Sequence, residues 1–170
     1  MDKSFENGCV LIVGGSGGIV SLCAQEFSQS GAKVAITYYK NEQTAFDLAK
    51  SINNEVKIYQ LYNSEPKSVE ETIQKVGNDY GSINTLVNAA GFDIPQKFIS
   101  EIDINLWKGV IDADINGFFN LVKFGLPHLR NSQGSIVFIS SAGLFKYPPG
   151  AIISVATKAV SNTHLRAHET

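Results

Sequence analysis

Residues 10–20 read VLIVGGSGGIV, an apolar run followed at once by a glycine-rich turn and then by the start of a helix-compatible stretch. Glycine permits a tight turn and lets a charged group approach the main chain closely. The free N–H groups at a helix N-terminus, aided by the helix dipole, favour a phosphate beside such a turn. Strand, turn and helix in this order predict a dinucleotide-binding βα unit, although a flexible loop without function fits the glycines alone about equally well.

Apolar runs and longer amphipathic stretches alternate along the rest of the chain. We predict strands at residues 9–13, 33–38, 56–61, 85–87 and 135–140, and helices at residues 17–30, 42–52 and 65–80. Such alternation produces right-handed crossovers and a doubly wound α/β fold, with helices on both faces of a parallel sheet. Residues 100–129 exceed one average helix, and their aromatic side chains indicate either a largely buried helix or a broken pair.

The composition is that of one ordinary globular domain, with 170 residues, 44% hydrophobic and 18% charged. A formal net charge of −2 with scattered basic residues makes nucleic acid an unexpected partner. No apolar run approaches the roughly 20 residues of a membrane helix, and the segment before the first strand is too short and polar for a signal peptide, so we expect no membrane partner and a cytoplasmic location. Cys9 and Cys23 show no pairing or ligand spacing and are interpreted as reduced packing residues.

At the fourth predicted strand, residues 86–91 read LVNAAG, whose small side chains leave room for a ligand over the carboxyl edge of the sheet. Together with the glycine turn and residues 134–143 (GSIVFISSAG), this segment resembles the short-chain dehydrogenase/reductase family. The likeness continues to Lys158 and covers the chain up to about Asn162. It implies a Rossmann-like, three-layer αβα domain with strand order 3-2-1-4-5, and an NAD(P)-dependent oxidoreductase that reduces carbonyls or oxidises alcohols by hydride transfer.

The family's glycine turn is matched at Gly14, Gly18 and Ile19, whereas Val20 replaces its last glycine. Valine there should displace the first helix outward unless a neighbouring side chain is small. The amide of Asn88 can tie neighbouring strands together. The resemblance places the cofactor against Gly14, Ser16, Gly17, Gly18, Ile19, Tyr39, Lys40, Tyr62, Asn88, Ala89, Ala90, Gly91 and Lys158.

The end of the second strand bears on the choice of cofactor. An acid at this place binds the ribose 2′-hydroxyl of NAD, whereas a basic residue accommodates the 2′-phosphate of NADP. No acid occurs there before Glu42, so we predict NADP(H) in preference to NAD(H), with Lys40 as the phosphate partner unless it is merely a solvated loop lysine. Tyr62 stands where the family has an acid after the third strand, and it either stacks on adenine or simply packs.

The catalytic positions match the family only in part. Ser141 and Lys158 correspond to the family's serine and lysine, but the tyrosine position, four residues before Lys158, is Ser154. An aliphatic hydroxyl is far less acidic than a phenol, so Ser154 is a poor proton donor. The family's asparagine position is Asp114, whose carboxylate we expect to pair with Lys158 and to oppose its electrostatic role.

Three explanations of these replacements stay open. The chain uses another donor, such as Tyr147 or a lysine-bound water; or it is a catalytically impaired relative that only binds dinucleotide or a partner; or it performs a different chemistry in the same pocket. We favour the oxidoreductase, because the rest of the cofactor-binding pattern is present.

The C-terminal residues carry separate expectations. Residues 163–170 resemble the translation of a sequencing-library adapter, so we interpret residues 1–162 as an incomplete NAD(P)-binding domain and the remainder as an artefactual tail. His164 and His168 are spaced for one helix face, but we predict no metal site. The family has further strands after the fifth, so we expect the outer edge of the strand at residues 135–140 to be unpaired. We also expect the 170-residue chain to bind the adenine half at best weakly, and to aggregate or pair abnormally. The resemblance implies that the full-length protein is a homo-oligomer acting on a small carbonyl or alcohol.

Overall fold

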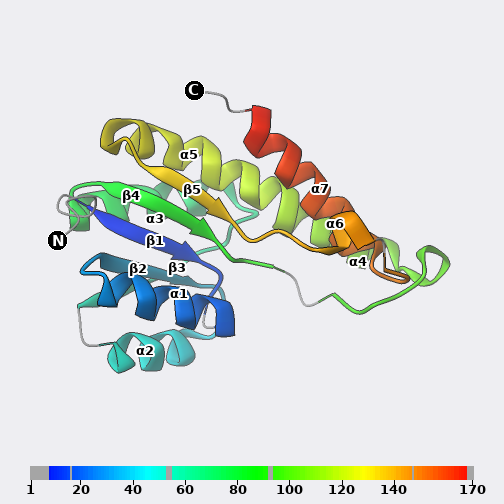
Figure 1. The fold of residues 1–170 in the computed structure, drawn as a ribbon, viewed down its shortest axis with the longest axis horizontal. Helices are drawn as coiled ribbons and strands as arrows, with labels where there is room; N and C mark the ends of the chain where they lie inside the picture. The colour runs from blue at the N-terminus through cyan, green and yellow to red at the C-terminus, as the bar shows by residue number, and fades with distance from the viewer. Residues whose placement is uncertain (1–7, 16, 53–54, 92–93, 147, 168–170) are drawn as a thin grey trace.

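The computed structural model describes residues 8–15, 17–52, 55–91, 94–146 and 148–167. Within these ranges one parallel sheet is formed by β1 (Cys9–Val13), β2 (Lys33–Tyr38), β3 (Val56–Gln60), β4 (Ile83–Asn88) and β5 (Ser135–Phe138). The strand order is β3-β2-β1-β4-β5, which confirms the predicted Rossmann-like arrangement (Figure 1). The order reverses between β1 and β4, and at such a switch point the loops diverge and leave a crevice.

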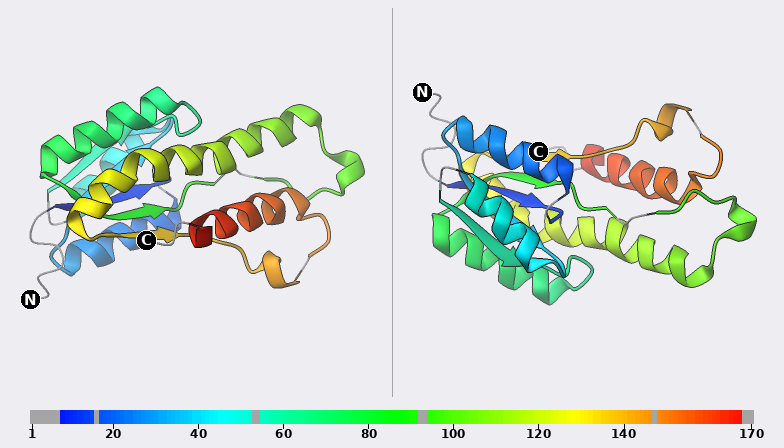
Figure 2. Two further views of the ribbon diagram at one scale, coloured as in Figure 1. Left: turned by 90° about the horizontal axis from the view of Figure 1, so that it is seen from above. Right: turned by 90° about the horizontal axis from the view of Figure 1, so that it is seen from below.

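Helices cover both faces of the sheet, as predicted. Helices α1 (Gly18–Gln29) and α2 (Glu42–Ser51) lie on one face, and α3 (Pro66–Tyr80) and α5 (Gly117–Ser132) lie on the other (Figures 1 and 2). The predicted ends of α1, α2 and α3 hold to within two residues, and Gly81, with a φ of 86°, ends α3. The largest difference at the start of an element is in β4, which begins at Ile83 because this residue pairs with Cys9 across an irregularity in the ladder.

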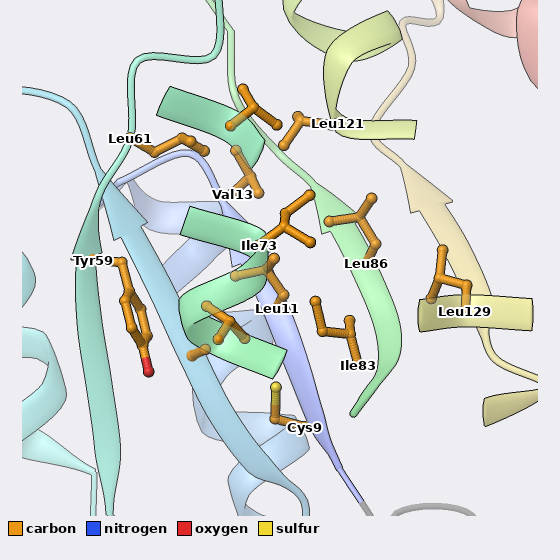
Figure 3. Close-up of a cluster of buried hydrophobic side chains, with 13 residues drawn as sticks. Cys9, Leu11, Val13, Tyr59, Leu61, Ile73, Ile83, Leu86, Leu121 and Leu129 are labelled. Carbon is orange, nitrogen blue, oxygen red and sulfur yellow. The ribbon is translucent and has the colours of Figure 1, made fainter. Parts of the chain in front are cut away.

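The hydrophobic core consists of two clusters, one on each side of the sheet. Figure 3 shows the cluster under α3 and α5, where Leu11 and Leu86 of the sheet pack with Ile73 and Leu121 of the helices. Cys9 belongs to this cluster, and burial raises the pKa of its thiol to about 12. Both cysteines are free thiols, which agrees with their interpretation as reduced packing residues.

The second cluster contains the valine that replaces a family glycine. Val20 is fully buried under α1 together with Ala24 and Ala32, and Ala89 packs against the same cluster. These neighbours have small side chains, so the condition under which valine can be accommodated without displacing α1 is met.

The region from Ile99 onward differs from both predicted alternatives. After a short turn at Ile99–Glu101, α4 (Ile104–Val110), the π-helical segment η3 (Ile111–Asn116) and α5 follow one another without a break. The prediction of a largely buried helix is wrong for Trp107 and Phe119, which are 37% and 47% exposed. The first half of this helical run extends beyond the sheet and packs against α7 (Ile152–Ala167), so the sheet does not cover Trp107 (Figure 1).

The outer strand β5 has a neighbour only on its β4 side within the described chain. Its residues alternate between exposed and half-buried, and Val137 is 41% exposed. The predicted unpaired edge is therefore present. Among the residues that the structure describes, no helix is both long and apolar enough to span a bilayer.

Candidate functional site

A cavity of about 400 Å³ opens at the carboxyl end of the sheet, at the switch point between β1 and β4. Small-molecule sites have volumes in this range, and open α/β sheets bind their ligands at this place. The residues that line the cavity come from the ends of four strands and from the α4–η3 segment: Val13, Gly14, Gly15, Thr37, Tyr38, Tyr39, Leu61, Asn63, Ser64, Ala90, Gly91, Gly109, Asp112, Ala113 and Asp114.

The glycine turn forms the floor of this cavity. Gly14 and Gly15 have φ angles of 141° and 74°, a region that side chains disfavour. A β-carbon on Gly14 would lie 2.7 Å from the backbone of Ala89 and Ala90, so the turn and the loop after β4 approach more closely than any other residue type allows. The Gly15 amide is already bonded, because it donates to the Thr37 carbonyl at 2.8 Å.

Helix α1 begins immediately beyond this turn. The N-cap of α1 is Gly17, which has no side chain to accept a hydrogen bond from the first amides. The first turn of α1 contains no acidic residue. The amides of Gly18, Ile19 and Val20 have no acceptor inside the helix, because the first turn of a helix has none. Gly17, Gly18 and Ile19 are exposed, so this helix terminus is an available anion-binding position.

Three of the predicted cofactor residues come together beyond the end of β2. The rings of Tyr39 and Tyr62 meet edge to face with centroids 5.2 Å apart, and the Lys40 ammonium lies 4.9 Å from the Tyr39 centroid. Gln60 connects the two tyrosines, because its amide donates to the Tyr39 carbonyl at 3.2 Å and to the Tyr62 hydroxyl at 2.9 Å. Tyr39 lines the cavity, and Tyr62 and Lys40 both contact the Tyr39 ring.

The loop after β4 is held mainly by backbone hydrogen bonds to the residues at the ends of β1 and β5. The Ala89 amide donates to the Val13 carbonyl at 2.8 Å, and the Ile139 amide donates to the Asn88 carbonyl at 3.1 Å. The Asn88 side-chain oxygen accepts the Ala90 amide at 3.2 Å. This oxygen stabilises the turn that presents Ala90 and Gly91 to the cavity, and the tie between strands that we predicted for this amide stays a prediction.

A buried ion pair lies at the far end of the cavity. The Lys158 ammonium is 3.2 Å from Asp114 Oδ2, and the two side chains are only 12% and 2% exposed. The same oxygen accepts the Thr157 hydroxyl at 3.0 Å, and the ammonium lies 5.3 Å from the ring centroid of Phe138. The predicted pairing of Asp114 with Lys158 is confirmed, and the positive charge of Lys158 is compensated by a neighbour within its own site.

The two serines are held by local backbone contacts. Ser141 Oγ accepts the Gly143 amide at 3.1 Å at the start of α6 (Gly143–Lys146), and the Ser154 carbonyl accepts the Thr157 hydroxyl at 3.2 Å. Among the described residues, no hydrogen bond joins Ser141 to Ser154 or either serine to the Lys158 ammonium. The described part of the chain does not include Ser16, Tyr147, His168 or the side chain of His164, so the predictions for these four residues stay predictions.

Sequence reasoning missed three residues that shape this site. Gly15 could have been found, because it belongs to the glycine turn. Thr157 could have been suspected from its place beside Lys158. Asn63 carried no local signal: its amide donates to the Ala113 carbonyl at 2.9 Å, fifty residues away.

A family model described as short chain dehydrogenase matches residues 8–168. The chain belongs to this family. An uncharacterized oxidoreductase of Staphylococcus epidermidis is 27% identical over 150 residues, which are 88% of this chain and 64% of the relative. A probable NADP-dependent mannitol dehydrogenase of Yarrowia lipolytica is 34% identical over 136 residues, 76% of this chain and 48% of the relative.

The fold comparison agrees with the family assignment. The crystal structure of a short-chain dehydrogenase/reductase of Brucella melitensis, described as a glucose/ribitol dehydrogenase, superposes with a TM-score of 0.88 at 27% identity. The match covers 96% of this chain and 66% of that structure. The chain thus spans two thirds or less of the length of each of these three relatives.

The close approach at Gly14 leads to a stability prediction. Gly14→Ala should lower the free energy of unfolding by about 2 kcal/mol or more, because the substitution adds both a strained φ and a steric clash. Gly91→Ala, in the same cavity but with no atom near its added β-carbon, should be nearly neutral. Urea denaturation of the two variants measures the difference, and equal stabilities would contradict the tight packing at Gly14.

Proposed function

We propose that this chain is the nicotinamide dinucleotide-binding part of an oxidoreductase that interconverts a small carbonyl compound and its alcohol by hydride transfer. The observation that carries the proposal is the cavity at the switch point, lined by Gly14 and Gly15 of the glycine turn, with the uncapped N-terminus of α1 following directly along the chain. The family to which the chain belongs is consistent with it.

The residues present fit such a cofactor. A β-carbon on Gly15, Gly17 or Gly18 would meet no atom within 4 Å, so this side of the turn is open to a diphosphate, and the amides of Gly18 and Ile19 would hold its charge. Tyr39, supported by Tyr62 and Gln60, would form a wall for the adenine half. Ala90 and Gly91 would leave room for the nicotinamide half near Asp114.

The bound nicotinamide supplies or accepts the hydride, so the chain's own residues must manage a proton at the substrate oxygen. Ser141 would hold that oxygen through its hydroxyl. Ser154 stands at the phenol position of the family, and its hydroxyl is too weak an acid to donate efficiently near neutral pH. Lys158 would promote proton transfer through its positive charge, and the buried Asp114 carboxylate reduces this effect.

The buried pair favours a second candidate function. Because Asp114 compensates Lys158 and Ser154 lacks a phenol, the site could retain dinucleotide binding without turnover. The two candidates differ in a simple respect: the oxidoreductase consumes reduced nicotinamide in the presence of a carbonyl compound, and the binding module does not.

We further propose that the cofactor is NADP(H). Lys40 follows the second strand, and its ammonium lies over the ring of Tyr39, a residue that lines the cavity, which supports a role in binding a 2′-phosphate. The Yarrowia lipolytica relative, named as NADP-dependent, is consistent with this preference.

Nucleotide titration of the chain tests both the function and the preference. NADPH should bind more tightly than NADH, and Lys40→Ala should weaken NADPH about tenfold while leaving NADH unchanged, as expected for the loss of one charge-assisted hydrogen bond. Lys50→Ala, which removes a nearby exposed charge on α2 that lies over Phe46, is the matched control. Calorimetry that detects neither nucleotide would overturn the proposed function; equal effects on both nucleotides would overturn only the preference.

Restoring the proton donor tests the role of the ion pair. Ser154→Tyr alone should give little carbonyl reduction, because Asp114 still compensates Lys158. Ser154→Tyr combined with Asp114→Asn should reduce carbonyls at least about tenfold faster, since a well-placed general acid contributes that much or more. The assay is NADPH oxidation with a panel of small aldehydes and ketones, with melting curves to confirm folding. Equal rates in the two variants would show that Asp114 does not suppress Lys158.

A further inference from the structure

The loop after β3 is tied to the helical run on the other side of the cavity by two side-chain amides. Asn63 Nδ2 donates to the Ala113 carbonyl at 2.9 Å, and Asn120 Nδ2 donates back to the Asn63 carbonyl at 3.0 Å. Asn120 is 5% exposed, so its bond is protected from water. Leu61, Asn63, Ser64 and Ala113 all line the cavity, so this pair of bonds fixes the loop after β3 against the helical run where both border the cavity.

Gly117 makes this contact possible. A β-carbon at position 117 would lie 2.7 Å from Asn63 Nδ2 and 2.8 Å from Asn63 Cγ. The backbone of Gly117 is ordinary α-helix, with φ of −61° and ψ of −43°, so a larger residue would not be excluded by its conformation. The glycine therefore serves the approach of Asn63 and not a turn.

The Ala113 carbonyl belongs to the π-helical segment η3. A π turn contains one more residue than an α turn, so the extra residue changes the direction of the side chains before it relative to those after it by about 100°. Such turns are rare and persist where specific contacts hold them. In η3 one of these contacts is the Asn63 amide, on the side of the segment that faces the loop after β3.

The next residue along the same segment is Asp114, whose carboxylate receives Lys158 and Thr157 from α7. The segment η3 is thus held by Asn63 at one residue and by the buried ion pair at its neighbour. A change in the position of the Ala113 carbonyl must therefore alter the direction of the Asp114 side chain, because the two residues are adjacent in one turn.

We propose that Asn63 is a positioning residue, which holds the π-helical segment so that Asp114 stays directed at Lys158 and the cavity keeps its width. The effect on the direction of Asp114 does not depend on the proposed function. The effect on the width of the cavity rests on the proposed function, because it is observed as nucleotide affinity.

Two variants break the contact in different ways. Asn63→Leu removes the donor. Gly117→Ala keeps the donor but displaces it, and alanine is a better helix former than glycine, so this variant should strengthen the helix itself while loosening the contact. Thr72→Val is the matched control. It removes a comparable hydrogen bond, from the Thr72 hydroxyl to the carbonyl of Gln60 at the end of β3, and it does not alter a contact of η3.

The readout is the rate at which acetic anhydride acylates Lys158 in the folded chain, measured by peptide mass spectrometry. Lys57, which pairs with Asp79 away from the cavity, is the internal reference. Asn63→Leu and Gly117→Ala should each raise the Lys158 rate relative to Lys57 about fivefold, the factor expected when one ordinary hydrogen bond is lost. Thr72→Val should leave the ratio unchanged.

The outcomes separate this inference from the proposed function. A wild-type ratio in Gly117→Ala overturns the positioning role of Asn63, and this variant decides the matter if Asn63→Leu does not fold. A ratio raised equally in Thr72→Val also overturns it, because general loosening would then explain the result. If the Lys158 ratio rises as expected but the wild-type chain binds neither NADPH nor NADH, the positioning role stands and the proposed function fails.

Discussion

At the carboxyl ends of β1 and β4, the backbone of Gly14 comes so close to that of Ala89 and Ala90 that no β-carbon fits between them. This contact brings the glycine turn and the loop after β4 to one place and leaves α1 to begin with free amides at the edge of the cavity. The parallel sheet holds the glycine turn in place, because the turn begins directly after the central strand β1, which is completely buried. The cavity and the positions proposed for the diphosphate and the nicotinamide all depend on this one constraint.

The opposite end of the cavity is governed by charge. Asp114 is buried and the Lys158 side chain is largely covered, so each charge would be costly to leave unpaired in that environment. The Thr157 hydroxyl adds a second donor to the same carboxylate oxygen, so the pair is well satisfied. A carboxylate at this position and a serine in place of the phenol act in the same direction, because both lower the ability of the site to deliver a proton. Under the proposed function, the residues assigned to dinucleotide binding therefore keep the family pattern more fully than those assigned to proton transfer.

Much of the fold could be predicted from the sequence, because it depends on patterns that are local. The alternation of apolar runs with amphipathic stretches predicted the parallel sheet, and the glycine turn marked where its ligand edge lies. The pairing of Asp114 with Lys158 was also predictable, since both positions could be placed by resemblance. The remaining features depend on contacts between distant residues. Asn63 is one polar loop residue among many in the sequence, and its partner Ala113 lies fifty positions away. The π-helical segment differs from an ordinary helix by a single residue, which leaves the apolar pattern almost unchanged, and the direction of the Asn88 amide depends on the turn it stabilises.

The central claim, that the glycine turn and the start of α1 hold a dinucleotide, is tested most directly by amide chemical shifts in the wild-type chain during titration with NADPH. The account predicts that the largest changes fall on Gly14, Gly15, Gly18 and Ile19, together with Ala90 and Gly91 across the cavity. Changes concentrated on α5 and α7 instead, with these amides unaffected, would contradict it.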